Sequence, residues 1–229
     1  MSVPSTDRAA GSKHGESALG HVFVVAAPSG TGKTTICRRI LEADPGLCIS
    51  TSHTTRSPRT GETDGVHYHF TDEPSFRALV DSDGFLEHAE YNGSLYGTSW
   101  DAIQAPIQEG GDVVLEIEVQ GARQVRDRMP EARLIFLLPP TLRALEERLR
   151  NRATDEESVI QRRMALVDRE LEAAEIFDFA VINDDLDRAV DEVLFVIRSV
   201  REGREQEAVA QHGREGVMTN WRASQTAAS

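Results

Sequence analysis

Short apolar runs alternate along the chain with stretches that have helical periodicity. The runs are each too short for a typical helix and are rich in residues that favour strands. They cover residues 22–26, 113–119, 134–138 and 179–182. Continuous apolar runs of this kind are typical of strands that are buried on both faces of a parallel sheet. The sequence therefore predicts an α/β fold with these four strands at its centre.

Two segments repeat apolar residues every three or four positions, which gives each of them one apolar face in a helical conformation. The repeats consist of Ile160, Met164, Val167 and Leu171 in the first segment, and of Leu186, Val190, Val193, Ile197 and Val200 in the second. We expect two amphipathic helices that flank the sheet.

Residues 52–98 differ from the rest of the chain, because glycines interrupt short pieces rich in aromatic residues, such as 66–70. This pattern predicts a small insertion with a mixed or antiparallel sheet. Both ends of the chain are polar and lack periodicity. We therefore expect a disordered N-terminal tail over residues 1–20 and a polar C-terminal tail over residues 204–229.

The composition is that of a globular protein, since 39% of the 229 residues are hydrophobic and 28% are charged. The formal net charge of -13 argues against binding to nucleic acid or to an anionic membrane, because both attract a basic surface. The chain also lacks the run of roughly 20 apolar residues that a membrane helix needs and the apolar stretch of a secretory signal. We expect a cytoplasmic protein, and the sequence leaves a homo-oligomer open.

The first apolar run leads into the loop A-P-S-G-T-G-K-T-T and then into a helical pattern. This is the context of a P-loop, in which backbone N–H groups and the positive end of the helix surround phosphate oxygens. We expect Lys33 to contact the phosphates and Thr34 to hold Mg²⁺ through its hydroxyl. The candidate ATP-binding residues of the loop are Ala27, Pro28, Ser29, Gly30, Thr31, Gly32, Lys33, Thr34 and Thr35.

The loop departs from the pattern G-x-x-x-x-G-K-[ST], because Ala27 stands at the first glycine position. A glycine-rich turn with an incidental lysine is the alternative, and the flanking strand and helix favour the P-loop. The loop by itself indicates a nucleoside triphosphate and leaves the acceptor open.

Further motifs follow in residues 52–98: S-H-T-T-R-S-P-R-T-G-E from Ser52, Y-H-F from Tyr68, F-L-E-H-A-E from Phe85 and Y-G-T from Tyr96. In order and spacing they resemble the GMP-binding segment of guanylate kinases. Two arginines and two phenolic hydroxyls can surround a monophosphate dianion. The residues that match this role are Arg56, Arg59, Tyr68 and Tyr96.

Glu87 stands beside apolar residues in F-L-E-H. A carboxylate there can accept hydrogen bonds from the ring N–H and the exocyclic amine of guanine, which adenine lacks, and Ser52 and Thr98 can donate to the guanine carbonyl. Such a site rejects an analogue without these groups by about 10⁴ or more, because its own polar groups would be left unpaired. We expect GMP, together with dGMP, as the acceptor.

Glu116 and Glu118 alternate with apolar residues in L-E-I-E, so the period of a strand places both side chains on one face. Ligands of open parallel sheets bind beyond the carboxyl ends of the strands, where these acids fall. We expect Glu116 to organise the hydration shell of Mg²⁺ or a phosphate-binding arginine, and Glu118 to contact the acceptor nucleoside. Guanylate kinases often have L-D-I-D here, and two solvated acids at a strand end are the alternative.

The segment that follows Pro139 and Pro140 resembles the arginine-bearing lid of guanylate kinases. Arginines on a closing segment can stabilise the charge of a phosphoryl group in transfer and exclude water. The arginines at family positions are Arg148, Arg152 and Arg163, whereas we expect Arg150 and Arg162 to be solvated. The family commonly has G-R-G-T where this chain has N-R-A-T, which reduces the flexibility expected of the lid.

The resemblance covers roughly residues 20–200 and implies a guanylate kinase that transfers the γ-phosphoryl group of ATP to GMP, giving ADP and GDP, with Mg²⁺ as cofactor. It implies a domain over residues 21–203, whose P-loop core comprises 21–51, 99–140 and 176–203. The GMP-binding insertion is 52–98 and the helical lid is 141–175. Asn183, which follows the fourth apolar run, resembles a position near the ATP base.

Two other interpretations stay open. Guanylate-kinase-like domains also serve as scaffolds that bind peptides, but these typically lose the P-loop lysine, which is present here as Lys33. A P-loop kinase for a different phosphorylated acceptor is the second alternative. The role of Glu87 distinguishes a guanylate kinase from a kinase for another acceptor. A wild-type protein that used GMP and AMP equally would contradict that role.

Overall fold

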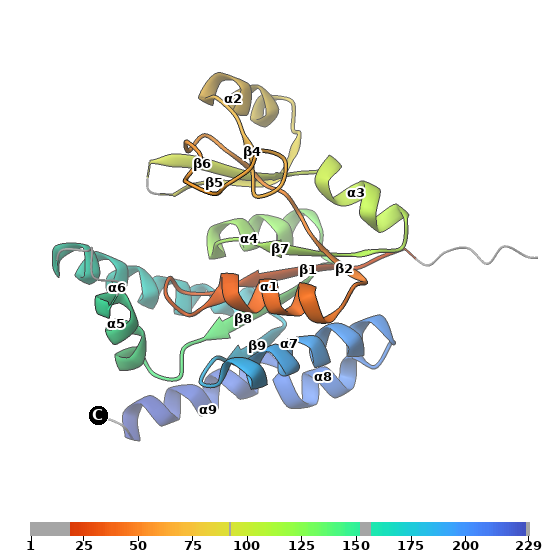
Figure 1. Ribbon diagram of the computed structural model, residues 1–229. Coiled ribbons are helices and arrows are strands. Elements are labelled where there is room, and N and C mark those ends of the chain that lie inside the picture. The colour runs from red at the N-terminus through yellow and green to blue at the C-terminus, as the bar shows by residue number, and fades with distance from the viewer. Residues whose placement is uncertain (1–18, 92, 152–156, 228–229) are drawn as a thin grey trace, which may run out of the picture.

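A parallel five-stranded sheet forms the centre of the molecule in the computed structural model, which describes residues 19–91, 93–151 and 157–227 (Figure 1). The strand order is β2-β7-β1-β8-β9, and every neighbouring pair is parallel. The strands are β1 (Val22–Ala26), β2 (Leu47–Ile49), β7 (Asp112–Glu116), β8 (Arg133–Leu138) and β9 (Phe179–Ile182). All four apolar runs that predicted central strands contribute to this sheet, so the predicted α/β fold is confirmed.

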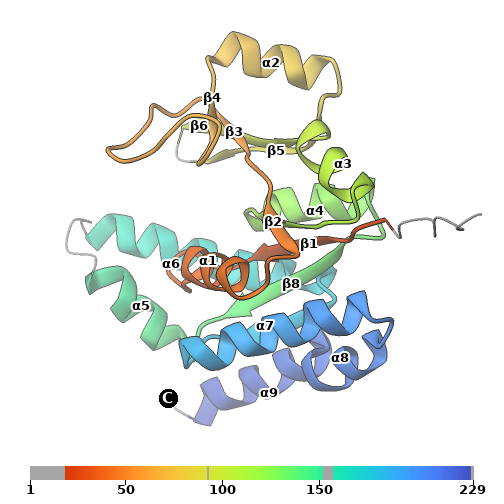
Figure 2. The ribbon, with the colours of Figure 1, turned by 45° about the vertical axis from the view of Figure 1, so that its right-hand side comes forward.

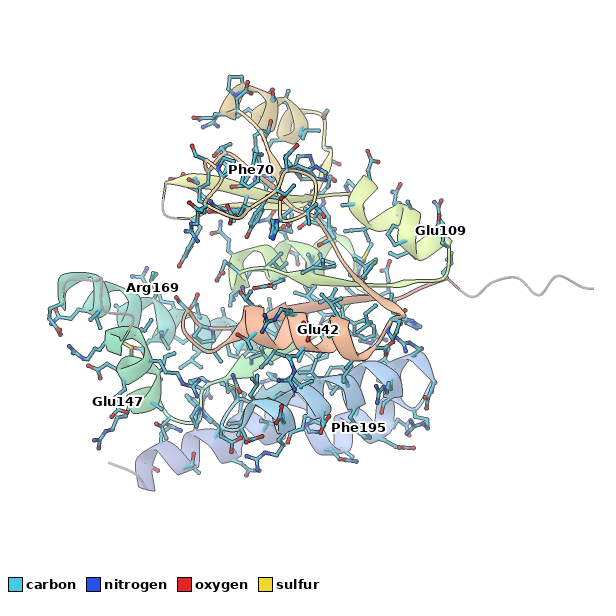
Figure 3. All side chains as sticks on the ribbon, in the orientation of Figure 1. Glu42, Phe70, Glu109, Glu147, Arg169 and Phe195 are labelled. Atoms are coloured by element: carbon cyan, nitrogen blue, oxygen red, sulfur yellow. The ribbon has the colours of Figure 1, made fainter. Side chains whose placement is uncertain are left out.

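Helices cover both faces of the central sheet, because side chains alternate along each strand. On β1, Phe23 and Val25 join one core cluster, whereas Val24 and Ala26 join another on the opposite face. The helices that pack on the first face include α1 (Lys33–Ala43) and α7 (Leu186–Arg201). Those on the second include α3 (Asp101–Gln108), α4 (Val119–Arg128), α5 (Leu142–Asn151), α6 (Glu157–Glu172) and the 3-10 helix η1 (Ala173–Ile176). Side chains fill the space between the sheet and these helices (Figure 3).

The two helices that the apolar periodicity predicts are both present. The repeat from Ile160 to Leu171 lies in α6, and the repeat from Leu186 to Val200 lies in α7. In α7 the predicted stripe is buried except at Leu186, which packs against the same core cluster while partly exposed. The amphipathic pattern therefore identifies the face that each helix turns to the sheet.

Residues 52–98 form a second, four-stranded sheet that stands apart from the central one in both views (Figures 1 and 2). Its order is β4-β3-β6-β5; β3 and β4 are parallel and the other pairs antiparallel, so the sheet is mixed, as predicted. The elements are β3 (His53–Thr54), β4 (His69–Phe70), α2 (Glu73–Asp81), β5 (Phe85–Tyr91) and β6 (Ser94–Ser99). Phe76 of α2 packs on Phe85 of β5 with ring centroids 4.5 Å apart, which fixes the helix on the sheet.

The strand predicted over residues 113–119 is too long at its C-terminal end. β7 ends at Glu116, Glu118 is the N-cap residue of α4, and Val119 is buried in the first turn of that helix. Alternation of apolar and polar residues cannot separate a strand from a strand that turns into a helix, because both bury every second residue here. Glu116 and Glu118 therefore belong to different elements instead of one strand face.

The C-terminal residues are helical, which corrects the prediction of a polar tail over residues 204–229. They form α8 (Glu205–His212) and α9 (Arg214–Ala227). Ala208, Met218 and Trp221 are buried in the two core clusters of the central sheet. These few apolar residues hold the two helices on the core. The other residues of the segment are mostly polar, so its composition did not indicate helices that pack on the sheet. The tail predicted over residues 1–20 lies almost entirely outside the described residues.

Within the part of the chain that the structure describes, no helix is both long and apolar enough to cross a bilayer.

Candidate active site

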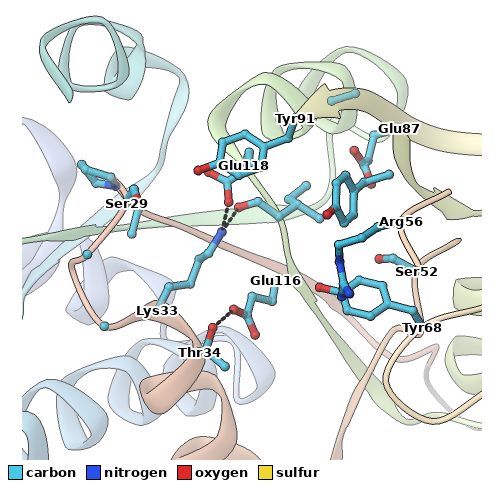
Figure 4. A pocket seen from close by; sticks show the side chains of 18 of the residues that line it. Ser29, Lys33, Thr34, Ser52, Arg56, Tyr68, Glu87, Tyr91, Glu116 and Glu118 are labelled. Atoms are coloured by element: carbon cyan, nitrogen blue, oxygen red, sulfur yellow. Dashed lines mark hydrogen bonds and ion pairs between the residues drawn. The ribbon is translucent and has the colours of Figure 1, made fainter. Parts of the chain in front are cut away.

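A cavity of about 380 Å³ lies between the loop that follows β1, the C-terminal end of β7 and the small sheet (Figure 4). It brings together residues predicted to bind ATP and residues predicted to bind GMP. The predicted residues that line it are Ala27, Pro28, Ser29, Gly30, Gly32, Lys33, Thr34, Thr35, Ser52, Arg56, Arg59, Tyr68, Glu87, Tyr96, Glu116 and Glu118. Two motifs that are separated in the sequence thus face one cavity.

The loop after β1 curls because two of its glycines have a positive φ. The φ values are 91° at Gly30 and 103° at Gly32, a region that residues with a Cβ rarely adopt. Gly32 is the N-cap residue of α1, so the unpaired N–H groups at the start of that helix lie at the cavity. Ala27 replaces the usual first glycine and is buried against the core, where its methyl group is accommodated.

The first two residues of α1 contact the two predicted acids. Lys33 Nζ donates to Ile117 O at 2.7 Å and to Glu118 Oε1 at 2.9 Å. Thr34 Oγ1 donates to Glu116 Oε1 at 2.5 Å. Burial by itself lowers the pKa of Lys33, but the charges of Glu118 and Glu116 outweigh it, so the pKa is raised. Lys33 is therefore a fully charged cation held at the cavity.

Arginines and tyrosines gather where the small sheet meets the cavity (Figure 4). Arg56 donates to both carboxylate oxygens of Glu62, at 3.0 and 2.8 Å, and its guanidinium lies 5.4 Å from the ring centre of Tyr68. Glu62 also accepts from the backbone N–H of Arg59 at 2.6 Å. Arg56 lowers the pKa of Glu62 to about 2, so the carboxylate stays charged and fixes the arginine.

Glu87 is a buried carboxylate on β5, only 4% exposed. It lies opposite Thr98 of β6, whose Oγ1 donates to Glu87 Oε1 at 2.7 Å, and Ser52 Oγ lies 3.2 Å from the same Thr98 oxygen. Burial raises the pKa of Glu87 to about 7, although the hydroxyl of Thr98 opposes this shift. The backbone N–H of Thr98 also donates to this carboxylate, and Glu87 lines the cavity next to Gly121.

Arg148 and Asn183 lie behind the loop instead of lining the cavity. Asn183 Nδ2 donates to Thr31 O at 2.6 Å, and the Arg148 guanidinium lies 3.4 Å from both Thr31 O and Asn183 O. These contacts stabilise the loop from its outer side. Of the other predicted lid arginines, Arg152 lies outside the described residues, and the structure describes only the backbone of Arg163.

The guanylate kinase family model matches residues 20–200 of the chain. The chain belongs to the guanylate kinase family. A guanylate kinase of Neisseria gonorrhoeae is 48% identical over 182 residues, which cover 80% of this chain and 89% of that protein. One of Methylobacillus flagellatus is 45% identical over 190 residues, covering 83% of this chain and 94% of the relative.

A solved structure agrees with the family assignment. The crystal structure of guanylate kinase from Anaplasma phagocytophilum superposes with a TM-score of 0.65 at 27% sequence identity, covering 80% of this chain and 86% of that one. The family match ends at residue 200, so α8 and α9 lie outside it. The resemblance that the motifs indicated is confirmed, and the C-terminal helices need a separate explanation.

Two residues of this guanylate kinase family member have contacts that the sequence did not reveal. A Cβ added to Gly121 of α4 would lie 2.4 Å from Glu87 Oε2, so glycine is required for the close approach of the carboxylate. Glu170 of α6 accepts from the backbone N–H of Ser29, and burial together with the charge of Glu118 raises its pKa to about 7. A glycine soon after a strand end, such as Gly121, can indicate a close contact. Glu170 cannot be distinguished in the sequence from a solvated polar residue of a helix.

Proposed function

We propose that the chain transfers the γ-phosphoryl group of ATP to GMP or dGMP in this cavity, giving ADP and GDP or dGDP. The chain is a nucleoside monophosphate kinase of the guanylate kinase family, which acts on GMP with ATP. The observation that supports the assignment of this cavity is that a phosphate loop and a buried carboxylate face each other across it. One end is suited to a triphosphate and the other to a guanine base.

The phosphate loop is proposed to bind the β- and γ-phosphates of ATP through its backbone N–H groups and Lys33. Lys33 is bonded to Glu118 and to Ile117 O. A phosphate oxygen would replace these partners, so the lysine would exchange one anion for another without becoming unpaired.

Mg²⁺ is proposed to bind with ATP, and the side chains present fit it. Thr34 Oγ1 and Glu116 Oε1 lie 2.5 Å apart, and hydroxyl and carboxylate oxygens are the ligands that Mg²⁺ prefers. The described residues contain no group of three or more His, Cys, Asp or Glu side chains that could hold a metal. Thr34 and Glu116 would hold the ion with phosphate oxygens and water, and the ion would supply positive charge to the phosphates.

GMP is proposed to bind with its phosphate against Arg56, Arg59, Tyr68 and Tyr96. The Glu87 carboxylate would accept from the ring N–H and the exocyclic amine of guanine, with Thr98 and Ser52 beside the guanine carbonyl. A GMP phosphate oxygen would then attack the γ-phosphorus, and the bond from that phosphorus to the bridging oxygen would break, releasing ADP. The attacking oxygen is already anionic, so no general base is required.

The lid arginines Arg148, Arg152 and Arg163 are proposed to stabilise the charge of the transferred group. Arg148 lies against the phosphate loop, 3.4 Å from Thr31 O, and this contact supports a role beside the phosphates. A position of Asn183 near the ATP base is part of the same proposal, supported by its bond to the loop. We also propose a cytoplasmic location, because ATP and GMP are metabolites of that compartment.

The test is an assay of ADP release with ATP and Mg²⁺, in which GMP, dGMP, AMP, UMP and CMP are offered in parallel. We expect turnover with the guanine nucleotides alone, and a loss of at least 10²-fold in the Lys33→Ala variant, because the lysine is the loop's only charged phosphate contact. Equal use of GMP and AMP would contradict the role of Glu87. GMP binding without any turnover would instead favour a binding module.

A further inference from the structure

Helix α9 packs against the segment that leads into the lid helix α5. In both views it runs beneath the central sheet toward the base of α5 (Figures 1 and 2). The family match ends at residue 200, before this helix, so the match does not account for the contact. Trp221 is only 3% exposed, which is unusual for a side chain in a polar C-terminal segment.

Two side chains of α9 bind the backbone of the β8–α5 connection. Trp221 Nε1 donates to Pro139 O at 2.6 Å in a buried bond. Gln225 Nε2 donates to Pro140 O at 3.2 Å, and its Oε1 accepts from the backbone N–H of Leu142 at 3.0 Å. Three backbone groups in four consecutive residues are therefore held from another helix.

The bond to Leu142 serves a need of α5 itself. The first N–H groups of a helix have no partner within the helix. In α5, Thr141 Oγ1 accepts from the N–H of Ala144 at 2.9 Å, as an N-cap residue does, and Gln225 accepts from the N–H of Leu142. One of these two N–H groups at the start of α5 is therefore bonded to a side chain of α9.

The same helix α5 contacts the phosphate loop further along. Its Leu145 and Leu149 lie so close to Gly30 that an added Cβ there would be 3.2 Å and 3.0 Å from their methyl carbons. Arg148 lies 3.4 Å from Thr31 O. Because a helix is stiff, a tilt of ~10° at Leu142 would shift Arg148 by roughly 1.5 Å over the ~9 Å between them.

We propose that Trp221 and Gln225 are positioning residues, which fix the base of α5 and thereby the placement of Arg148 and of the phosphate loop during phosphoryl transfer. The proposal rests on the proposed role of Arg148 in the reaction. A displacement of about 1 Å in a group that acts in the transition state can reduce the rate by roughly 10²-fold. The binding of GMP takes place on the small sheet and does not depend on this anchor.

The test uses the full chain with Trp221→Phe and Gln225→Leu combined, which keeps an aromatic and an aliphatic side chain at the two positions and removes all three hydrogen bonds. We expect kcat to fall about tenfold or more, the Kd for GMP to stay within twofold, and the amides of α5 to exchange hydrogen faster. The matched control is Arg222→Ala, at an exposed position of the same helix, which should leave all three quantities unchanged.

Two outcomes would overturn the proposal: an unchanged kcat and exchange rate in the folded double variant, or a parallel loss of kcat and GMP affinity. If the double variant does not fold, single variants decide. Gln225→Glu keeps the acceptor for the N–H of Leu142, so its kcat should exceed that of Gln225→Leu, and equal values would refute the anchor. A wild-type chain without GMP turnover would refute the proposed function, while the exchange of α5 would still test the anchoring.

Discussion

At the scale of single residues, the burial of Glu87 determines both its chemistry and its use. A carboxylate that is 4% exposed and has a pKa near 7 is poorly solvated, and its hydrogen bonds from Thr98 do not compensate for the water it has lost. A ligand that brings two N–H donors provides that compensation. In the proposed binding mode we therefore expect guanine to bind best to the charged form of Glu87, which dominates only above the pKa.

This leads to a pH-dependent affinity for GMP. Below pH 7 the raised pKa leaves Glu87 largely protonated, and a neutral carboxyl group cannot accept both guanine donors. We expect GMP to bind about tenfold more weakly at pH 6 than at pH 8, since one pH unit on each side of the pKa changes the charged fraction by that factor. Titration calorimetry at several pH values measures this.

The control for that prediction is Glu87→Gln, which has no titrating group at the same place. The GMP phosphate itself titrates near pH 6, and both proteins experience that change equally. The difference between wild type and variant therefore isolates Glu87. Parallel pH profiles of the two proteins would show that the carboxylate is ionised throughout or does not touch the base.

Sequence reasoning was most successful at this scale where residue type and order carry the chemistry. Lys33, Arg56 and Glu87 were predicted because a cation or a carboxylate in those motifs has few other purposes, and all three line the cavity. Gly121 and Glu170 were missed because their importance lies in a contact with a distant residue, Glu87 in one case and Ser29 in the other. No local pattern encodes such a contact.

At the scale of elements, the small sheet is attached to the core mainly through β5 and α4. Gln124 of α4 accepts from the backbone N–H of His88 at 3.1 Å and donates to His88 O at 2.7 Å. Arg128, one turn later, donates to Phe85 O at 2.7 Å. These side chains pair with β5 much as a neighbouring strand would, on both sides of Glu87.

We expect Gln124→Leu to weaken GMP binding by about tenfold and to leave ATP binding unchanged. Losing this pair leaves the N–H and the C=O of His88 without partners, at a cost of about 1–3 kcal/mol, and lets Glu87 shift relative to Gly121. Steady-state KM values for GMP and ATP separate the two effects. The control is Gln120→Leu, at an exposed position on the same helix. Equal changes in both KM values would mean that Gln124 supports the fold generally.

Element boundaries were predicted less well than the elements themselves. The run over residues 113–119 was assigned to one strand, but the chain turns after Glu116 and enters α4 at Val119. Tertiary packing decides this turn: Glu118 holds Lys33, and Val119 joins the core beneath the helix. The apolar period of two is satisfied by either path, so the sequence could not distinguish them.

At the scale of the whole molecule, the composition of the C-terminal segment led to a wrong prediction, because a few residues decide its structure. Residues 205–227 are mostly polar, yet Ala208, Met218 and Trp221 hold two helices on the central sheet. The net charge was similarly uninformative about the site. Although the formal charge of the chain is -13, neighbouring carboxylates fix cations such as Lys33 and Arg56 at the cavity, and in the proposed function these cations would bind the anionic substrates.

The arrangement of two sheets around one cavity also predicts how ligands affect the stability of the whole chain. In the proposed binding mode GMP would contact the small sheet on one side and the core on the other, so we expect it to bind tightly only to the folded molecule. At 100 times its Kd, a ligand that binds only the folded state adds about 2.7 kcal/mol to the free energy of unfolding. For a chain of this length that corresponds to a rise in Tm of roughly 5–10 °C.

Thermal unfolding followed by circular dichroism with GMP or AMP at equal concentration measures this rise. We expect the full shift with GMP and a shift of less than about 1 °C with AMP, because AMP offers a ring nitrogen acceptor to Glu87 where guanine offers a donor. In Glu87→Gln the difference between the two nucleotides should shrink, since an amide can donate as well as accept. An equal rise in Tm with both nucleotides in the wild type would mean that contacts with the phosphate alone hold the ligand. Glu87 would then not select the base.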